Sequence, residues 1–194
     1  MTTTQEQQAD QATKCAGLLN RCKEALPDRT AHLIFWPIAL LGVVFDLWTK
    51  QAVFAVLREK PDQSLAIIDG LLTFRMALND GAAFGIASGQ KPILIGISML
   101  AMVGILGLFL LGAARQRAVQ AALGLFTAGV CGNLWDRLFN EGRVRDFIDV
   151  VYWPGRHWHT FNVADAMLCI SVGLLVITML FTDSSCQERD QPQK

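Results

Sequence analysis

The residues best suited to chemistry lie in one stretch of the sequence, residues 129–165. Asn133, Asp136 and Arg137 stand at positions i, i+3 and i+4 near the end of an apolar run, so a helix presents them on one face. Polar groups beside a long apolar run are expensive unless they have a function or a partner. We predict that Arg137 binds a carboxylate through two hydrogen bonds and keeps it ionised.

Three more polar residues complete this stretch. Asp146 lies in the polar passage that follows, which we interpret as a connecting loop, and Asn162 and Asp165 begin the next apolar run. The spacing of Asn162 and Asp165 is also that of a helix capping box, and this interpretation stays open. Two carboxylates in a partly desolvated site share one proton, because one of the two pKa values rises. One carboxylate then takes a proton from water while the other polarises a carbonyl group. We predict that Asp146 and Asp165 form such a hydrolytic site just outside the hydrocarbon of a membrane.

Other catalytic chemistries have weaker support. No serine or cysteine stands at motif spacing with a base that activates it. His157 and His159 lack a third ligand and the H-E-x-x-H spacing of a zinc site, so we expect no metal. The aromatic residues Tyr152, Trp153 and Trp158 favour an interfacial loop in this segment.

The bulk composition sets the outline of the molecule. The 194 residues fit a single domain, and 52% of them are hydrophobic. The formal net charge is zero, so we expect no nucleic-acid partner. The five cysteines contain no C-x-x-C pair and are interpreted as ordinary thiols.

The ends of the chain are polar. Residues 1–30 lack the apolar core of a signal peptide. We expect disorder over 2–11 and a short surface helix over 12–26. The chain then divides into a polar extension (1–30), a membrane domain (31–182) and a polar tail (183–194).

Four apolar runs predict membrane-spanning helices, over residues 32–57, 92–114, 118–138 and 162–182. The second run has 23 residues without a charge. That is enough to cross a bilayer of about 30 Å. The third run carries Gly124, Ala128 and Gly132 at a spacing of four, and this stripe of small residues lets another helix approach closely.

The first predicted helix carries charge where its apolar run ends. The thirteen apolar residues before Asp46 are too few to cross a bilayer, so the helix carries Asp46 near membrane depth or stops before it. Asp46 and Lys50 stand at i and i+4 on one face. Two interpretations remain open: the pair anchors the helix end, or Asp46 faces the polar cluster of residues 129–165.

A small sheet is predicted between the first two helices. Residues 65–78 have the pattern of a strand, an Asp-Gly turn and a second strand with apolar residues at every other position. The segment NDGAAFG (79–85) follows, and its glycines indicate a turn or loop. We expect the sheet to lie on the membrane surface, with its apolar face toward lipid or helices.

Four spans place both termini on one side of the membrane and the sheet and Asp146 on the other. Lysine and arginine residues are almost equally numerous on the two sides, so charge does not decide which side is cytoplasmic.

Five segments resemble the bacterial lipoprotein signal peptidase family, also called signal peptidase II. They occur in the family's order between the expected spans, and the resemblance covers residues 33–182. The segments are FDLWTK (45–50), NDGAAFG (79–85), CGNLWDR (131–137), VRDFIDV (144–150) and FNVAD (161–165).

The resemblance implies a mainly α-helical membrane protein: a four-transmembrane-helix bundle with a small extracytoplasmic β-rich cradle. Both termini are then cytoplasmic, and the active site faces the extracytoplasmic side of the bacterial plasma (inner) membrane. The resemblance thus supplies the orientation that the charge count left open.

The resemblance also implies an activity and a set of site residues. The family removes the signal peptide from diacylglyceryl-modified prolipoproteins, cleaving on the amino side of the lipidated cysteine as an aspartic endopeptidase without a cofactor. Asp146 and Asp165 match its catalytic aspartates. Prolipoproteins and membrane lipid are the implied partners, and a monomer inhibited by cyclic peptides is expected. The matching supporting positions are Asp46, Lys50, Asn79, Gly81, Asn133, Asp136, Arg137, Asn162 and Ala164.

Three features depart from the family pattern. The polar extension of residues 1–30 is longer than usual, and the segment between Arg137 and Asp146 is one residue longer than the commonest spacing. His159 and Thr160 stand where the family often has a proline. None of these departures removes a catalytic group.

Two other functional classes remain as alternatives. A transporter or proton channel uses intramembrane acids to relay charge, but here Asp136, Asp146 and Asp165 lie at the ends of predicted spans. A structural membrane partner uses a polar cluster only to lock helices together. Substitution of the aspartates separates the classes, because a peptidase loses turnover while it stays folded.

Overall fold

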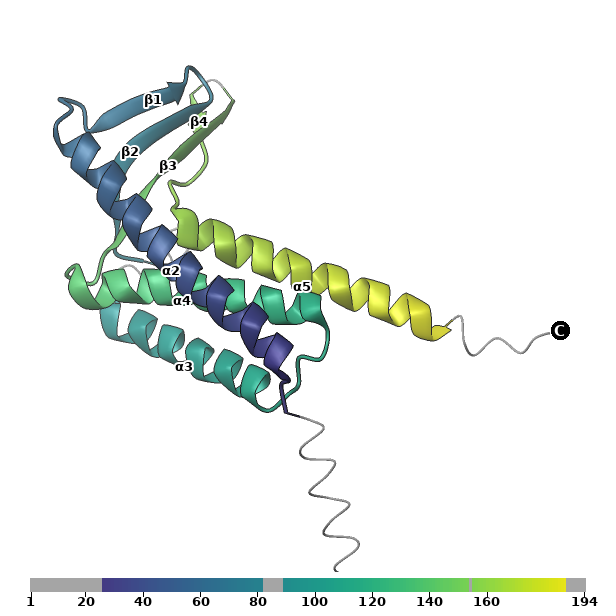
Figure 1. Cartoon of the computed structure of the whole chain (residues 1–194). Helices are drawn as coiled ribbons and strands as arrows, with labels where there is room; N and C mark the ends of the chain where they lie inside the picture. The colour runs from purple at the N-terminus through teal and green to yellow at the C-terminus, as the bar shows by residue number, and fades with distance from the viewer. Residues whose placement is uncertain (1–25, 82–88, 154, 188–194) are drawn as a thin grey trace, which may run out of the picture.

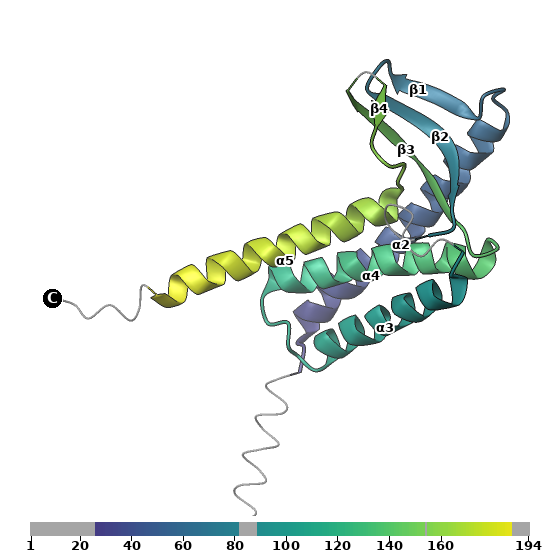
Figure 2. The same ribbon diagram turned by 180° about the vertical axis from the view of Figure 1, so that it is seen from behind.

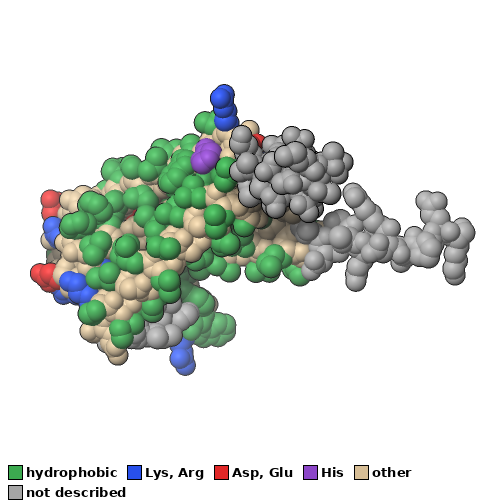
Figure 3. All heavy atoms as spheres, turned by 90° about the horizontal axis from the view of Figure 1, so that it is seen from below, with side chains coloured by type: hydrophobic (Ala, Val, Ile, Leu, Met, Phe, Trp, Pro, Cys, Tyr) green, Lys and Arg blue, Asp and Glu red, His purple; other side chains and the backbone are tan. Residues whose placement is uncertain are grey.

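The computed structural model describes residues 26–81, 89–153 and 155–187, with side chains as far as residue 181. It contains four long helices, α2 (Arg29–Arg58), α3 (Lys91–Leu110), α4 (Arg117–Phe139) and α5 (Val163–Gln187). Each is long and apolar enough to cross a membrane. Figure 3 shows hydrophobic side chains over much of the face seen from below. The four predicted spans are confirmed, whereas the disorder expected over 2–11 and nearly all of the helix expected over 12–26 fall outside the described residues.

Local sequence explains where two of the helices begin and end. α2 starts three residues earlier than predicted, because the Asp28 carboxylate caps it by accepting the Ala31 N–H at 2.9 Å. Arg117 at the start of α4 also binds both Asp28 oxygens, which holds the pKa of this carboxyl well below its usual range. α3 ends four residues earlier than predicted, where Gly112 adopts a φ of 71°, a conformation that glycine takes without strain.

α4 is the central helix and packs against α2, α3 and α5. Its stripe of small residues faces α2. A Cβ atom on Gly124 would lie 2.8 Å from an α2 carbonyl oxygen, and Ala128 lies directly against Gly42. A side chain at Gly132 would overlap the Asp46 carboxylate. The close approach predicted from the stripe is therefore confirmed, and it brings Asp46 next to the polar end of α4.

Two apolar clusters hold the other helices in place. Phe35 of α2 and Phe109 of α3 stack with ring centroids 4.0 Å apart, in a cluster that includes Leu123 of α4. Ala164 and Met167 of α5 belong to a second cluster with α4. Figures 1 and 2 show α5 diverging from α3 and α4 toward its C-terminal end. The last turns of α5 therefore expose apolar side chains, as a lipid-facing helix does.

A four-stranded antiparallel sheet stands at one end of the bundle (Figure 1). Its strands, in spatial order, are β1 (Ser64–Ile68), β2 (Leu72–Asn79), β3 (Val144–Trp153) and β4 (Arg156–His157). The predicted strand, Asp-Gly turn and strand are confirmed as β1 and β2, with Gly70 at a φ of 70°. Of the segment NDGAAFG, residues 82–85 lie outside the described residues.

The sequence-based interpretation of Asp146 as a loop residue was wrong. Asp146 lies within β3, opposite Ala77 of β2. The same strand also exchanges backbone hydrogen bonds with Phe161, so it is paired on both edges. The segment expected to be an interfacial loop instead continues β3 and turns back as the two-residue strand β4. Asp146 is thus held by a sheet rather than by a flexible connection.

The sheet lies at the opposite end of the bundle from the start of α2 and the end of α5. In Figures 1 and 2 the start of α2 and the far end of α5 both lie away from the sheet. The placement of both termini on one side of a membrane stays a prediction.

Candidate active site

Lys50 of α2 organises the most deeply buried part of the site. Its ammonium nitrogen lies 2.8 Å from the Asp46 carboxylate and 3.3 Å from that of Asp136, and all three side chains are 0% exposed. Asp46 also accepts the backbone N–H of Ala164 in α5, at 2.8 Å. The interpretation that Asp46 faces the polar cluster is confirmed, whereas its pair with Lys50 lies inside α2 and does not anchor the end of that helix, which continues to Arg58.

Asp136 binds Arg145 and not its helical neighbour Arg137. Its Oδ1 accepts Arg145 Nη2 at 2.6 Å and Nε at 3.1 Å, and its Oδ2 accepts the Arg145 backbone N–H at 3.0 Å. Arg145 precedes Asp146 in β3, so these bonds attach the start of that strand to the end of α4. Sequence reasoning missed Arg145. Its spacing of nine residues from Asp136 signals nothing until the chain is known to turn back there.

Arg137 has a different environment from the one predicted. Its Nη2 donates to the Gly81 carbonyl oxygen at 3.0 Å, and no carboxylate lies within ion-pair distance in the described part of the chain. Its Nε is buried without a hydrogen-bond partner among the described residues. Such a buried donor is costly, so Arg137 is suited to accept a ligand oxygen.

Three carboxamides are fixed so that each turns its NH₂ group toward a carboxylate. The Asn133 oxygen accepts from Lys50 at 3.1 Å, the Asn79 oxygen from the Gly81 N–H at 2.9 Å, and the Asn162 oxygen from the Asp165 N–H at 3.0 Å. Lysine ammonium and backbone N–H groups are donors only. They therefore leave the amide NH₂ groups free to face the acids.

Asp146 and Asp165 receive these NH₂ groups. Asn162 donates to Asp146 at 2.6 Å and Asn79 donates to its other oxygen at 3.0 Å. Asn133 donates to Asp165 at 2.8 Å. Asn162 contacts both acids, because its backbone N–H also donates to Asp165 at 3.1 Å.

The capping interpretation and the site interpretation describe the same residues. Asn162 and Asp165 exchange the two reciprocal bonds of a capping box at the start of α5. The remaining oxygen of Asp165 faces Asn133, and the NH₂ group of Asn162 faces Asp146. The cap thus fixes the position of Asp165 relative to β3.

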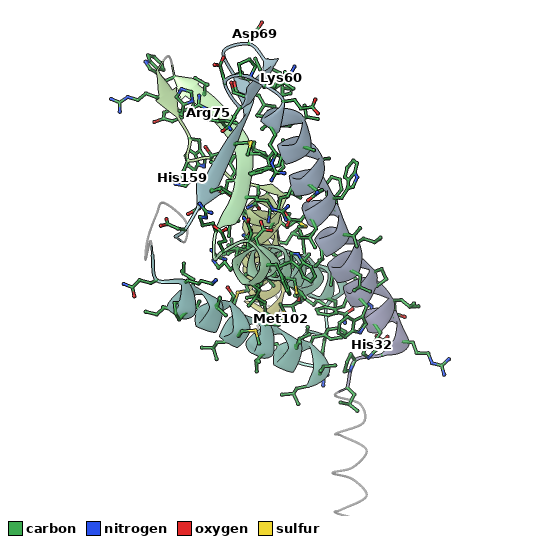
Figure 4. All side chains as sticks on the ribbon, turned by 90° about the vertical axis from the view of Figure 1, so that its left-hand side faces the viewer. His32, Lys60, Asp69, Arg75, Met102 and His159 are labelled. Atoms are coloured by element: carbon green, nitrogen blue, oxygen red, sulfur yellow. The ribbon has the colours of Figure 1, made fainter. Side chains whose placement is uncertain are left out.

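Both acids open onto one pocket of about 450 Å³. Asn79, Asn133 and Arg137 line its polar side, and Trp158, His159 and Thr160 line it from the segment after β4. In Figure 4 His159 lies on the side of the sheet away from α2. The lining becomes apolar along α5 at Ala166, Leu168 and Cys169. The pocket therefore joins a polar site to the lipid-facing helix.

The electrostatics of the pair match a shared proton. Burial and then the charge of Asp165 raise the pKa of Asp146 to about 6, against the hydrogen bonds from Asn79 and Asn162 and the charge of Lys50. The Asp146 side chain is 1% exposed. Asp146 therefore holds a proton at a higher pH than an ordinary aspartate does.

The structure brings together all the residues singled out from the sequence for the site. Ala164 and Gly81 take part through their backbones. The Ala164 N–H donates to Asp46, the Gly81 N–H donates to Asn79, and the Gly81 carbonyl oxygen accepts from Arg137.

Among the described residues no group of three or more metal-ligating side chains is found. His157 instead contacts Asp149, a buried acid of β3 that sequence reasoning missed. No local pattern signalled this contact, because it forms only when β4 pairs with β3 and sets His157 opposite Val151, close to Asp149.

Comparison with known proteins gives a consistent family. A sequence model described as signal peptidase (SPase) II matches residues 38–181. The lipoprotein signal peptidase of Geobacter metallireducens is 36% identical over 162 residues, covering 82% of this chain and 97% of that protein. That of Halalkalibacterium halodurans is 34% identical over 148 residues, covering 76% and 92%. That of Mycobacterium leprae is 33% identical over 184 residues, covering 89% and 85%.

Two solved structures have a similar fold. Both are described as bacterial membrane enzyme structures obtained by the in meso method, at 2.3 and 1.9 Å resolution. The first has a TM-score of 0.69 and 30% identity, covering 85% of this chain and 94% of its own. The second has a TM-score of 0.64 and 33% identity, covering 78% and 92%.

Proposed function

The chain belongs to the signal peptidase II family of aspartic peptidases, and from that premise we propose that it removes the signal peptide from diacylglyceryl-modified prolipoproteins. It cleaves the peptide bond on the amino side of the lipid-bearing cysteine. Neither a transporter nor a purely structural partner accounts for this family membership.

The observation that carries the proposal is the junction of two acids on one pocket, a buried Asp146 and a partly buried Asp165. Asp146 comes from β3 and Asp165 from α5, and Asn162 bonds to both. The pocket of about 450 Å³ that they line has room for a peptide segment and a water molecule.

The reaction follows from the protonation of the pair. The ionised carboxylate takes a proton from a water molecule, whose oxygen attacks the carbonyl carbon of the residue before the cysteine. The protonated carboxyl, assigned to Asp146 by its raised pKa, donates to the carbonyl oxygen. A proton then passes to the cysteine nitrogen as the C–N bond breaks. The products are a signal peptide with a free carboxylate and a lipidated cysteine with a free amine.

Neighbouring polar groups stabilise the charge that develops. The carboxamides keep their NH₂ groups on the acids throughout, so they hold the pair at a fixed geometry. Arg137 lines the pocket with an Nε that lacks a protein partner in the described chain. We assign this donor to a substrate carbonyl oxygen, which gains negative charge during attack.

The membrane places the substrate in this pocket. The apolar lining along α5 continues to lipid-exposed side chains such as Ile170 and Val172. The diacylglyceryl chains of the substrate remain in the bilayer beside this helix, so the scissile bond arrives at the depth of the headgroups. Tethering in this way supplies proximity with few peptide contacts.

The same proposal sets the orientation and the partners. Both termini are cytoplasmic, and the sheet and the acid pair face the extracytoplasmic side. The enzyme acts as a monomer without a cofactor, and cyclic peptides that occupy the pocket inhibit it.

Purified protein in lipid bilayers, incubated with a diacylglyceryl-modified precursor, tests the proposal. We expect a product whose new amino terminus is the lipidated cysteine, and no cleavage of the unmodified precursor. Asp146→Asn abolishes the product, whereas Asp69→Asn in the exposed β1–β2 turn leaves it unchanged. Cleavage at another bond, or normal cleavage by Asp146→Asn, contradicts the proposal.

A further inference from the structure

A second buried acid of β3 binds partners on both neighbouring strands. Asp149 is 1% exposed, and both of its oxygens lie close to His157 Nδ1 of β4, at 2.9 and 3.0 Å. Arg75 of β2 approaches it at 3.5 Å. Figure 4 shows Arg75 on the side of the sheet where His159 also lies. These contacts of Asp149, His157 and Arg75 do not include any bond to Asp146 or Asp165 among the described residues.

The contact of Asp149 with His157 fixes one end of a pocket wall. The wall is the segment Trp158–Thr160, which follows β4 directly and lines the pocket beside the acid pair. At its far end Phe161 exchanges backbone hydrogen bonds with Ile148, at 2.8 and 3.1 Å. At its near end the Trp158 N–H donates to the Val150 carbonyl oxygen at 2.8 Å. The wall is therefore a short bridge attached twice to the strand that carries Asp146.

The two attachments are alike, and neither depends on a particular side chain. The bonds at Phe161 and Trp158 are backbone bonds, which most sequences can form. β4 has only two residues, and so short a hairpin strand is marginal without further support. The pair formed by Asp149 and His157 is a side-chain contact that supports β4.

Because Asp149 is buried, its contact with His157 favours one position of the hairpin over others. A buried carboxylate without partners is costly, so the sheet favours the hairpin position in which His157 covers Asp149. Arg75 is half-exposed and more distant, and cannot replace that cover. The position of His157 in turn sets where Trp158 begins the wall.

We propose that Asp149 is a positioning residue, which acts through His157 to hold the wall Trp158–Thr160 against the peptide segment of the substrate. It sets the width of the pocket beside the acid pair and takes no part in proton transfer. This inference rests on the proposed peptidase function, because its readout is cleavage of the lipid-modified precursor.

Steady-state cleavage of the lipid-modified precursor by the full-length protein in lipid tests the inference. We expect Asp149→Ala and His157→Ala each to raise KM by about tenfold, as for the loss of one charge-assisted hydrogen bond, with kcat within about twofold of wild type. Asp149→Asn keeps an oxygen that accepts from His157 and restores most of the affinity. The double variant is no worse than either single variant. Arg156→Ala, an exposed neighbour in the same hairpin, serves as the matched control and leaves KM unchanged.

Three outcomes overturn the inference. The first is an unchanged KM in His157→Ala, with thermal unfolding of the variant measured beside that of the wild type. The second is an equal loss of kcat and folded protein in Asp149→Ala and Asp149→Asn, which shows a structural role alone. The third is additive effects in the double variant. Asp146→Asn in the same assay separates the two proposals, because residual cleavage by that variant contradicts the peptidase site and not the wall.

Discussion

Two pairs of carboxylates lie side by side in this protein with different kinds of neighbour, and all of them except the partly buried Asp165 are buried. Asp46 and Asp136, the cation-paired acids, contact the ammonium of Lys50, and Asp136 also binds Arg145. No lysine or arginine nitrogen lies within ion-pair distance of the other pair, the amide-held acids Asp146 and Asp165, in the described part of the chain. Their side-chain partners are carboxamides alone.

The difference indicates that the cation-paired acids have a structural role and the amide-held acids a chemical one. A carboxylate in contact with a cation is held in place by it, so Asp46 and Asp136 serve to join α2, α4 and β3. A carboxylate held by neutral amides keeps its position without being locked in one protonation state. Asn133 touches both sets, since its oxygen faces Lys50 and its NH₂ group faces Asp165. Through Asn133, the cation-paired acids and Lys50 help to position the amide-held acids, and no cation among the described residues contacts the amide-held acids directly.

Replacing one acid of each pair by asparagine is expected to give the largest effects, on cleavage for one pair and on stability for the other. Asp165→Asn removes a proton-transfer group, and we expect cleavage to fall by about 10²- to 10⁴-fold while the protein remains folded. Asp136→Asn instead leaves Lys50 and Arg145 short of a counter-charge, and we expect a lower thermal unfolding temperature. Cleavage of the lipid-modified precursor and thermal unfolding in detergent check both variants. The comparison fails if Asp136→Asn alone abolishes turnover in a protein as stable as wild type.

Removal of the shared cation is the next largest change. Lys50→Met leaves Asp46 and Asp136 buried with too little positive charge, and breaking such a buried pair costs about 3–5 kcal/mol of folding free energy. Unfolding in mixed micelles measures it. Lys60→Met, an exposed residue beyond the end of α2 that Figure 4 labels, is the matched control and leaves stability within about 0.5 kcal/mol. A small loss for Lys50→Met shows that the cation-paired acids and Lys50 do not join the helices.

The amide-held acids predict a pH dependence. The pKa of Asp146 is about 6 in the folded protein against an ordinary value of 3.8, so the folded state holds an extra proton between these values. Its contribution to stability is complete below about pH 4 and is lost as the pH rises through about 6, by about 3 kcal/mol. Asp146→Asn flattens this part of the stability profile. Activity falls over the same rise in pH, because Asp146 loses the proton that it donates. Equal slopes in both proteins between pH 4 and 6 would show that Asp146 does not titrate there.

Sequence predicted the spans and the candidate acids because both leave local signals. The uncharged run after Lys91 and the alternation in β2 each follow from one element's own periodicity. β3 was missed because VRDFIDVV has no clean alternation, and its pairing with β2 and Phe161 is non-local. Arg137 was assigned a carboxylate because helical spacing placed Asp136 beside it.

Contacts between residues on different elements leave no local pattern in the sequence. Arg145 takes Asp136 because the turn after α4 returns β3 to that helix end. Asp149 gains His157 only when a hairpin closes between them. The fold of the helices was thus predictable from local patterns, whereas the supporting contacts of the site required the register of the sheet.

The smallest predicted effects come from two matched amides. Asn133→Leu removes the donor to Asp165 and the acceptor for Lys50, and we expect cleavage to fall by about 10- to 100-fold through loss of a hydrogen bond to a charged group. Gln51 also offers an amide near the cation-paired acids, at 3.3 Å from Arg145, but from the exposed side of α2. Gln51→Leu should change cleavage less than about twofold, because water replaces that contact. Cleavage rates of the two variants in lipid decide whether Asn133 is the link between the two pairs. Equal losses of cleavage in both variants would show that any amide near the cation-paired acids matters. The distinction between cation-paired and amide-held acids would then not explain activity.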